Sequence, residues 1–269
     1  MNRRELALAL GSAAFAAGLR AHAALAAQPG DQAAAGAVTA PPRPKVAMLV
    51  YPDMILLDLV GAQTMLSIAM ADIHLVWKNL DPVSTDVGLP VSANTSFATC
   101  PAELDVLFVP GGLKGTVALM RDKEVLDFLA DRGARARYVT SVCTGSLALG
   151  AAGLLNGYRA TSHWYVRDLL PLMGATVAPD RVVVDRNRIT GGGVTAGLDF
   201  GLTLVAALRD DEYARRIQLL LEYAPKPPFD AGEPESAGST LVQEVLDRRM
   251  PLIAAARAAA AGLAGAPRK

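Results

Sequence analysis

Short apolar runs alternate along the chain with longer segments in which apolar residues recur at helical spacing. Runs rich in β-branched residues, at 45–52 (KVAMLVYP), 106–112 (VLFVPGG) and 138–142 (YVTSV), predict buried strands. Between them, 55–70 (ILLDLVGAQTMLSIAM) and 124–134 (EVLDFLADRGA) have the spacing of helices that bury one or more faces. This alternation of strand and helix predicts an α/β fold.

The later part of the chain continues the same alternation. Further strands are predicted at 73–80, 159–163 and 183–192, and further helices at 144–155 and 197–209. The strands are apolar almost throughout, so both faces of the sheet should be buried. The pattern therefore predicts a single doubly wound, mainly parallel sheet sandwiched by helices.

Several candidate functional residues directly follow predicted strands. In open sheets of this kind, ligands bind beyond the carboxyl ends of the strands. Asp58, Gly111, Gly112, Cys143 and the glycines at 191–193 all occupy such positions, so all should line that edge. Each glycine run also has an ordinary alternative role, because glycine commonly follows a strand simply to make a turn.

Cys143 stands where the β-branched run 138–142 stops and a small-residue helix begins. A strand-to-helix turn lifts its residue above the sheet edge, as in a nucleophile elbow, and Gly145 and Ser146 supply the small neighbours it needs. The unpaired amides of the first helical turn should favour a thiolate and lower the pKa of Cys143. The alternative is a buried cysteine that packs as a small hydrophobic side chain.

Charge and cysteine content narrow the classes of function. The 269 residues include 26 basic and 26 acidic side chains, which gives no electrostatic footprint for nucleic acid and favours a small-molecule ligand. The two cysteines, Cys100 and Cys143, form no CxxC motif and no Cys/His cluster, so no metal site is predicted. An oxidising compartment would permit a disulfide between them, but Cys100 is interpreted as a packing residue.

The N-terminus has the features of an export signal. Residues 1–27 carry an Arg3–Arg4 pair, an Ala- and Leu-rich stretch and a small-x-small pattern at 24–26, which indicate a Tat-like or other secretory signal. The protein should then be periplasmic or secreted, without stable membrane association once the signal is removed. The alternative is an uncleaved amphipathic helix on a cytoplasmic protein.

The rest of the chain divides into three parts. Residues 28–44 are rich in Ala, Pro and Gly and are typical of a linker. The folded domain is predicted at 45–235, followed by a helical tail at 236–269 that Pro251 should break.

Five stretches of the chain form a recognisable series. They are LLDLVGA (56–62), FVPGG (108–112), SVCTGSLALGAAGLLNGYRATSHW (141–164), ITGGGVTAGLDFGLTLVAAL (189–208) and LLLEYAPKPPFDAG (219–232). In this order they resemble the DJ-1/PfpI superfamily and, within it, the isonitrile (isocyanide) hydratases. The resemblance implies a flavodoxin-like fold, a nucleophilic Cys143, no cofactor, and a homodimer in which the C-terminal tail lies on the partner subunit.

Two positions distinguish the branches of this superfamily. PfpI-type peptidases carry histidine directly after the nucleophile, whereas this chain has Thr144, so the resemblance disfavours a peptidase. His163 lies beyond the elbow helix and is interpreted as a structural or dimer-surface residue. DJ-1-like redox sensors, glyoxalases and proposed deglycases carry a glutamate where this chain has Asp58, as isonitrile hydratases do.

The resemblance implies a lyase that adds water to an isonitrile, giving an N-substituted formamide through a thioimidate on Cys143. Asp58 would supply the proton, and burial together with repulsion from the thiolate should raise its pKa. Thr144 would orient the nucleophile or the water, and the backbone amides of Gly112 and Thr144 would form an anion-stabilising pocket. Otherwise, Asp58 would be a helix N-cap and Thr144 an ordinary first-turn residue.

Two other functions compete with hydration. The first is a DJ-1-like redox sensor whose Cys143 is oxidised without turnover, which Asp58 in place of glutamate disfavours. The second is the ligand-sensing half of an AraC-type regulator, which would need a helix-turn-helix domain after residue 232, where the chain is short and not basic. Trp77 and Trp164 are interpreted as core or interface fillers.

Overall fold

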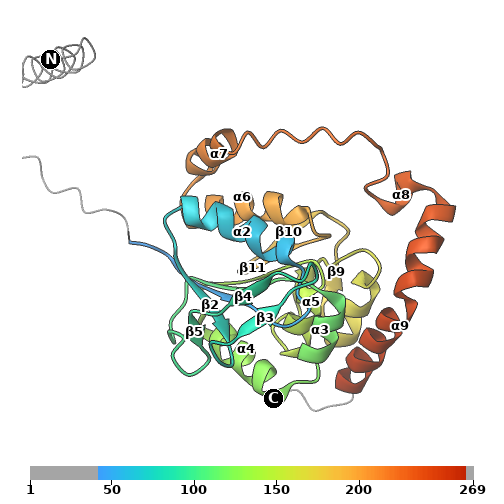
Figure 1. Ribbon diagram of the computed structural model, residues 1–269, viewed down its shortest axis with the longest axis horizontal. Helices are drawn as coiled ribbons and strands as arrows, with labels where there is room; N and C mark the ends of the chain where they lie inside the picture. Colours follow the sequence, from blue (N-terminus) through green and yellow to red (C-terminus); the bar gives the residue numbers. More distant parts are fainter. Residues whose placement is uncertain (1–41, 265–269) are drawn as a thin grey trace, which may run out of the picture. The chain divides into compact units, whose positions relative to one another are not determined.

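The computed structural model describes residues 42–264 (Figure 1). The predicted signal at 1–27 and nearly all of the predicted linker at 28–44 lie outside the described residues, so neither is tested. The first strand begins at Lys45.

A seven-stranded sheet forms the centre of the fold, in the order β10-β11-β7-β6-β1-β2-β5. All neighbouring strands run parallel except the β10–β11 pair, which is antiparallel. The strands are β1 (Lys45–Leu49), β2 (Asp72–Trp77), β5 (Thr95–Ser96), β6 (Val106–Val109), β7 (Tyr138–Val142), β10 (Val182–Asp185) and β11 (Arg188–Gly191). The central strands are buried on both faces, which confirms the predicted mainly parallel sheet.

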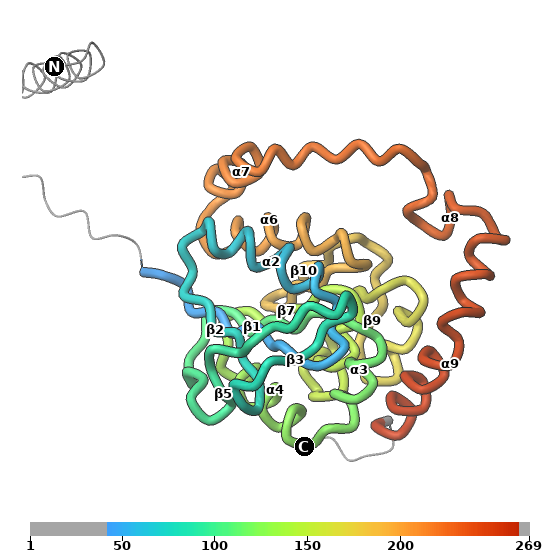
Figure 2. Tube along the Cα trace, viewed as in Figure 1, coloured from blue at the N-terminus to red at the C-terminus, as the bar shows by residue number. Residues whose placement is uncertain are grey.

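Helices cover both faces of this sheet (Figures 1 and 2). One face carries α2 and α6, which pack against each other, with α7 against α6, and the other carries α3, α4 and α5. The helices are α2 (Leu56–Ile68), α3 (Leu113–Leu119), α4 (Lys123–Arg135), α5 (Gly145–Ala151), α6 (Ala196–Leu208), α7 (Asp211–Leu220), α8 (Pro234–Ala237), α9 (Ser239–Ala264) and the 3-10 helix η1 (Arg167–Met173). The layers are those of a doubly wound fold, as predicted.

Two predicted strands differ from the structure. In the 159–163 stretch only β8 (Arg159–Ala160) is extended, and it pairs with β9 (Thr176–Val177) outside the main sheet. The 183–192 stretch is not one strand, because the chain reverses at Arg186, which has a φ of 54°. It folds as the antiparallel pair β10–β11, and a second small antiparallel pair joins β3 (Pro82–Ser84) to β4 (Pro90–Ser92).

Helix α9 differs from its prediction as well. It runs without a break through Pro251, so the predicted break is wrong. Proline removes one backbone donor, but the helix is held by packing, because Ile253, Ala256 and Ala260 are buried against the core. Within its own chain α9 contacts η1, α3, α5 and α8, and the tail lying on a partner subunit stays a prediction.

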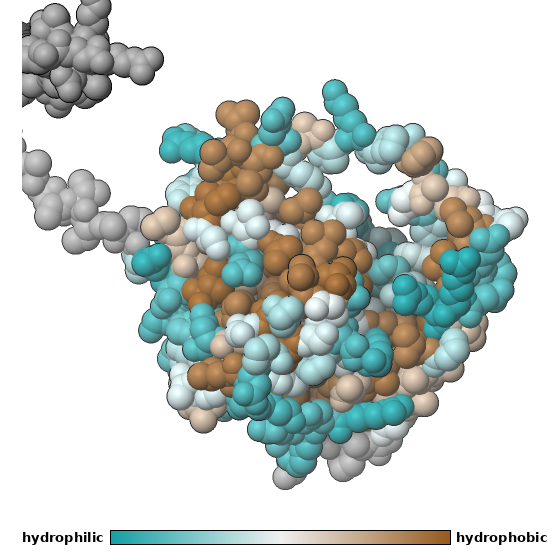
Figure 3. All heavy atoms as spheres, viewed as in Figure 1, coloured by the Kyte–Doolittle hydropathy of each residue, from teal (hydrophilic) through white to brown (hydrophobic). Residues whose placement is uncertain are grey.

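The connection from α7 to α9 is the most open part of the described chain. Residues 222–233 contain no helix or strand and link α7 to α8 through a turn at Glu222 and bends within 228–233 (Figure 2). On the face in Figure 3, apolar side chains gather over α2 and α7, where Leu57, Val60, Leu219 and Leu220 are exposed. Within residues 42–264, no helix has the length and apolar character needed to cross a membrane.

Candidate active site

Cys143 occupies a strained turn between β7 and α5. Its φ is 56°, in the left-handed region that side chains rarely adopt, so the predicted elbow geometry is confirmed. The Cys143 amide donates to the carbonyl oxygens of Gly191 (3.1 Å) and Gly192 (2.7 Å). The Cys143 carbonyl accepts from the hydroxyls of Ser146 (3.3 Å) and Ser162 (3.0 Å). These four bonds fix the turn from both sides.

Glycine is required on both sides of the thiol. A Cβ on Gly145 would lie 2.2 Å from the carbonyl oxygen of Val109, so only glycine lets β7 turn this closely past the end of β6. A Cβ on Gly111 would lie 2.6 Å from both Asp58 Oδ2 and Cys143 Cβ. The Asp58 carboxyl group and the Cys143 side chain therefore both lie against Gly111. A side chain at position 111 would displace one of them.

Asp58 comes from the first turn of α2 and is fully buried. Its Oδ2 accepts from the Gly111 amide at 2.8 Å. Asp58 is not the N-cap, because Ile55 holds that position and Asp86 Oδ1 accepts from the Leu56 amide at 2.9 Å. The N-cap alternative is therefore wrong.

Burial raises the pKa of Asp58 to about 7, as predicted in direction. The hydrogen bond from the Gly111 amide opposes the rise, while the charge of Asp86 adds to it. The predicted contribution of Cys143 is wrong, because a hydrogen bond with its thiol lowers the pKa of Asp58. At neutral pH the carboxyl group is therefore poised between its acid and its base form.

The prediction of a lowered pKa for Cys143 is wrong. Burial and the charge of Asp58 raise the pKa of the thiol above its ordinary value. The amide and hydroxyl of Thr144 act in the opposite direction, as the helix N-terminus was expected to do, but they are the weaker influence. The resting site therefore keeps a proton on the thiol and needs a base to remove it.

Thr144 links the elbow to the exit of β6. Its Oγ1 accepts from the Gly112 amide at 2.9 Å and lies 2.8 Å from Thr116 Oγ1. The Thr116 hydroxyl lies in turn 3.2 Å from the hydroxyl of buried Tyr51, which donates to the Pro110 carbonyl at 2.8 Å. This buried polar chain holds the floor of the site together.

The predicted anion pocket from two amides is not formed as expected. The Gly112 amide is already bonded to Thr144 Oγ1, so it is not free to stabilise a developing anion. The Thr144 amide acts on the Cys143 sulfur itself, where it favours the thiolate. Of the two predicted donors, the structure leaves only Thr144 directed at the reacting atom.

An aromatic segment at 163–165 lies close to the buried thiol. Burial and the negative charges of Cys143 and Asp58 raise the pKa of the Tyr165 hydroxyl, so this ring lies close to both groups. His163 stacks near Tyr165, with ring centroids 3.8 Å apart. Burial and the positive charges of Arg249 and Arg167 lower the pKa of His163 to about 4, so its ring is neutral at pH 7.

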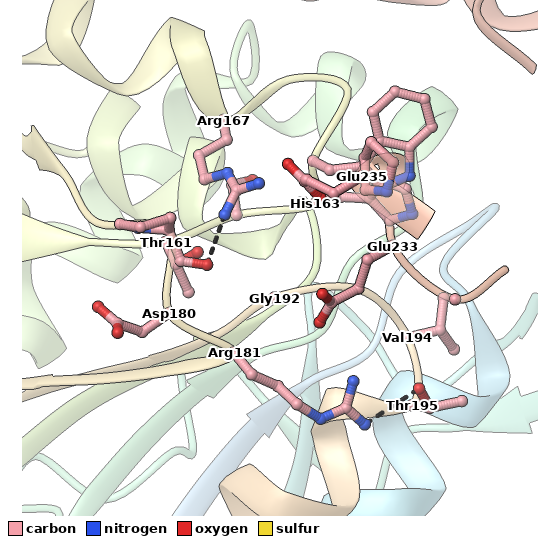
Figure 4. Close-up of a pocket in the computed structure, with 16 residues that line it drawn as sticks. Thr161, His163, Arg167, Asp180, Arg181, Gly192, Val194, Thr195, Glu233 and Glu235 are labelled. Atoms are coloured by element: carbon pink, nitrogen blue, oxygen red, sulfur yellow. Dashed lines mark hydrogen bonds between the residues drawn. The ribbon is translucent and has the colours of Figure 1, made fainter. Parts of the chain in front are cut away.

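Three cavities surround this segment. One of about 320 Å³ and one of about 240 Å³ share Ile55, Tyr165 and Arg249, and the smaller also contacts Gly112. A third, of about 390 Å³, is polar, and Figure 4 shows Arg181 pointing to Thr195, whose hydroxyl accepts from it at 3.2 Å. Trp164, predicted as a filler, lines two of them.

Comparison with known proteins decides the family. The DJ-1/PfpI family model matches residues 44–207. The chain belongs to the DJ-1/PfpI family. It is 51% identical over 208 residues to the isonitrile hydratase of Pseudomonas putida, which covers 77% of this chain and 90% of that protein.

Solved structures agree with this family assignment. A THiJ/PfpI family protein from Pseudomonas syringae superposes with a TM-score of 0.80 at 50% identity, covering 90% of this chain and 98% of that one. DJ-1beta of Drosophila melanogaster has a TM-score of 0.64 at 21% identity, covering 68% of this chain and 100% of that one, and shares the fold.

Of the four predicted site residues, the elbow brings three together, Cys143, Asp58 and Thr144. The fourth, Gly112, has a structural role, because its amide is bonded to Thr144 Oγ1. Sequence reasoning missed Tyr165 and Arg249, because Tyr165 lies in the turn before η1 and Arg249 lies on α9, and neither is at the end of a strand. Within residues 42–264, no three His, Cys, Asp or Glu side chains lie close enough together to hold a metal ion. Both cysteines are free, and Cys100 is buried in the core.

Proposed function

We propose that this protein hydrates an isonitrile to an N-substituted formamide. The observation that carries the proposal is the buried pair of Asp58 and Cys143, in which the Asp58 pKa is about 7. A carboxyl group with a pKa near the working pH both takes and gives a proton readily. The identity with the Pseudomonas putida isonitrile hydratase supports the same activity.

The first step joins the Cys143 sulfur to the terminal carbon of the isonitrile. The raised pKa of the thiol requires a base, and the Asp58 carboxylate takes the thiol proton as the sulfur attacks. Asp58 then delivers this proton to the same carbon, whose lone pair accepts it. One C–S bond and one C–H bond form, the carbon–nitrogen triple bond becomes a double bond, and the product is a thioimidate.

The second step releases the formamide. The Asp58 carboxylate, ionised again, removes a proton from a water molecule whose oxygen attacks the thioimidate carbon, and this proton reaches the substrate nitrogen. The tetrahedral intermediate then collapses, the C–S bond breaks, and the remaining water proton returns to the sulfur. The sum is one isonitrile and one water giving one N-substituted formamide, with Cys143 and Asp58 restored.

Thr144 positions the reacting groups in both steps. Its amide and hydroxyl act on the sulfur, so they stabilise the thiolate as it leaves in the second step. Its hydroxyl also holds the Gly112 backbone at 2.9 Å. The residue therefore fixes the sulfur relative to the glycine turn that carries the Asp58 contact.

The direct test is formation of N-formamide from an aromatic isonitrile, followed by ultraviolet absorbance. Cys143→Ala and Asp58→Asn should each lower kcat by at least about 10³-fold, because each removes a group that bonds to the substrate or moves its proton. Cys100→Ala, which removes the other buried thiol, should leave turnover unchanged. Absence of turnover in the wild type, with Cys143 still alkylated by iodoacetamide, would replace hydration by a redox role.

We propose further that the protein is a homodimer. Leu219, Leu220 and Phe229 are 82%, 70% and 79% exposed, and side chains of this kind are commonly covered in an assembly. Sedimentation velocity should give twice the mass of one chain, and Leu220→Asp should shift the protein toward the monomer. A wild type that sediments as a monomer would contradict the proposal.

We propose export for the same protein, on the basis of the sequence of residues 1–27. In a bacterial host, the mature form should accumulate outside the cytoplasm without the first 27 residues, which intact mass would detect. Replacement of Arg3 and Arg4 by lysine should retain the precursor inside the cell. A full-length chain found only in the cytoplasm would contradict export.

A further inference from the structure

The Cys143 thiol has no direct contact with solvent, because its residue is 0% exposed. Two of the cavities around the aromatic segment share Tyr165 and Ile55. Ile55 is three residues before Asp58 and its amide donates to the Gly111 carbonyl at 2.9 Å. Tyr165 responds to the charges of both Cys143 and Asp58. These two residues therefore border both cavities and lie close to the reacting pair.

The larger of these two cavities, about 320 Å³, lies between the aromatic segment 163–165 and helix α9. Trp164 and Tyr165, with ring centroids 5.6 Å apart, form one wall. Val242 and Val245, both half-buried, belong to the other. We call this space the α9 groove. Its volume is within the range of small-molecule sites, which are lined mostly by apolar and aromatic side chains.

The charges of the α9 groove select against an ionic ligand. Its lining includes one anionic residue, Glu233, and one cationic residue, Arg249, so the formal charges cancel. His163 adds none, because its pKa of about 4 keeps the ring neutral. A neutral group with a flat apolar body has the best match to these walls.

We infer that the α9 groove binds the N-substituent of the isonitrile and selects neutral aromatic substituents, with Trp164 and Val245 as specificity-determining residues. This inference rests on the proposed hydration. An isonitrile is linear from its substituent through nitrogen to the terminal carbon, so its head is narrow. The narrow head passes Tyr165 and reaches Cys143, while the substituent remains in the groove. A buried thiol can therefore react with a substrate whose larger part is bound in a cavity that does not contact the thiol.

The test compares 2-naphthyl isonitrile with methyl isonitrile in the full-length protein. Val245→Phe fills the groove and should lower kcat/KM for 2-naphthyl isonitrile at least tenfold, mainly through KM, while methyl isonitrile changes less than twofold. Met250→Phe is the matched control. It adds a ring to the same helix at an exposed position outside the cavities of the site and should alter neither substrate.

A binding measurement keeps the two proposals separable. Calorimetry with Cys143→Ala should show N-(2-naphthyl)formamide bound, and the added Val245→Phe or Trp164→Ala should weaken that binding at least tenfold. If the wild type hydrates both isonitriles and Val245→Phe slows both equally, the groove inference is overturned and hydration stands. If the wild type hydrates neither, hydration fails. If Val245→Phe does not weaken the binding of N-(2-naphthyl)formamide, the groove inference is overturned, whether or not the wild type hydrates the isonitriles.

Discussion

The elbow and the α9 groove lie next to each other but are built in different ways. At the elbow, Cys143, Asp58 and Thr144 are all fully buried, and backbone groups of neighbouring strand ends make most of the bonds. The groove is lined mainly by half-buried or exposed side chains from the aromatic segment 163–165, the connection before α8, and α9. The comparison indicates that backbone bonds hold the reacting groups of the elbow in place. In the proposed groove, the identity of the lining side chains determines which substituent is bound.

The largest expected effect comes from the charge buried at the elbow. The pKa of Asp58 rises from 3.8 to about 7 on folding. Between these two pH values the folded protein therefore binds a proton on Asp58 that the unfolded chain has already released. Asp58 therefore reduces stability as the pH rises from about 4 to about 7, by up to about 4 kcal/mol. Asp58→Asn should increase the free energy of unfolding, far more at pH 8 than at pH 4.5.

Urea denaturation at both pH values measures this effect. Asp127→Asn, a change at an exposed carboxylate on α4, is the control and should show no comparable pH dependence. If Asp58→Asn increases the free energy of unfolding equally at pH 8 and pH 4.5, the carboxyl group is not desolvated at the elbow.

Gly145→Ala should break the elbow itself. The new Cβ would lie 2.2 Å from the Val109 carbonyl oxygen, so β6 and β7 must move apart. We expect the free energy of unfolding to fall by about 3 kcal/mol. Gly262→Ala on α9, where nothing lies within 4 Å of the new Cβ, should be neutral or slightly stabilising. If the two substitutions change the melting temperature equally, the expected difference between the tightly packed elbow and the open end of α9 is wrong.

Thr144→Val tests the polar chain beneath the elbow. The change leaves the buried Gly112 amide without its acceptor at 2.9 Å, which should cost about 2 kcal/mol and lower kcat about tenfold or more. Thr64→Val is the matched control, because the Thr64 hydroxyl bonds only the exposed Val60 carbonyl of its own helix. If both substitutions cost the same, the Thr144 hydroxyl has no special structural role.

The smallest effect is expected where α9 meets η1. Arg257 and Asp168 form an exposed ion pair between these two elements. Arg257→Gln should lower the free energy of unfolding by less than about 1 kcal/mol, because exposed pairs are screened by water and salt. Ala256, fully buried on the same helix, provides the contrast, since Ala256→Glu should release α9 from the core. Limited proteolysis of the tail would distinguish the two outcomes.

Local patterns explain what could be predicted from the sequence. The β-branched run before Cys143 and the small residues after it are sufficient for the elbow, and the apolar strands are sufficient for a parallel sheet. Asp58 follows the first strand, so its place at the same sheet edge followed from topology. The direction of its pKa shift was predicted from burial and from repulsion by the thiolate, and of these two causes only burial raises the pKa.

Long-range packing decided what the sequence could not reveal. The thiol pKa depends on how completely residues from several elements bury Cys143, and this outweighs the local effect of the helix N-terminus. The continuity of α9 through Pro251 depends on its contacts with η1 and α3. Arg249 reaches the cavities only because α9 docks there, and nothing in its own segment indicates that position.

The parallel pairing of β6 with β7 places Val109 opposite Ser141, each two residues before the glycine or cysteine of the site. The hydrogen-bonded ladder between the two strands therefore sets the position of Gly111 relative to Cys143, and a slip of β7 by one residue would turn Cys143 to the other side of the sheet. The backbone pairing alone sets this spacing. Within such a frame, the acid, the residue after the thiol or the groove walls can be exchanged without moving the nucleophile.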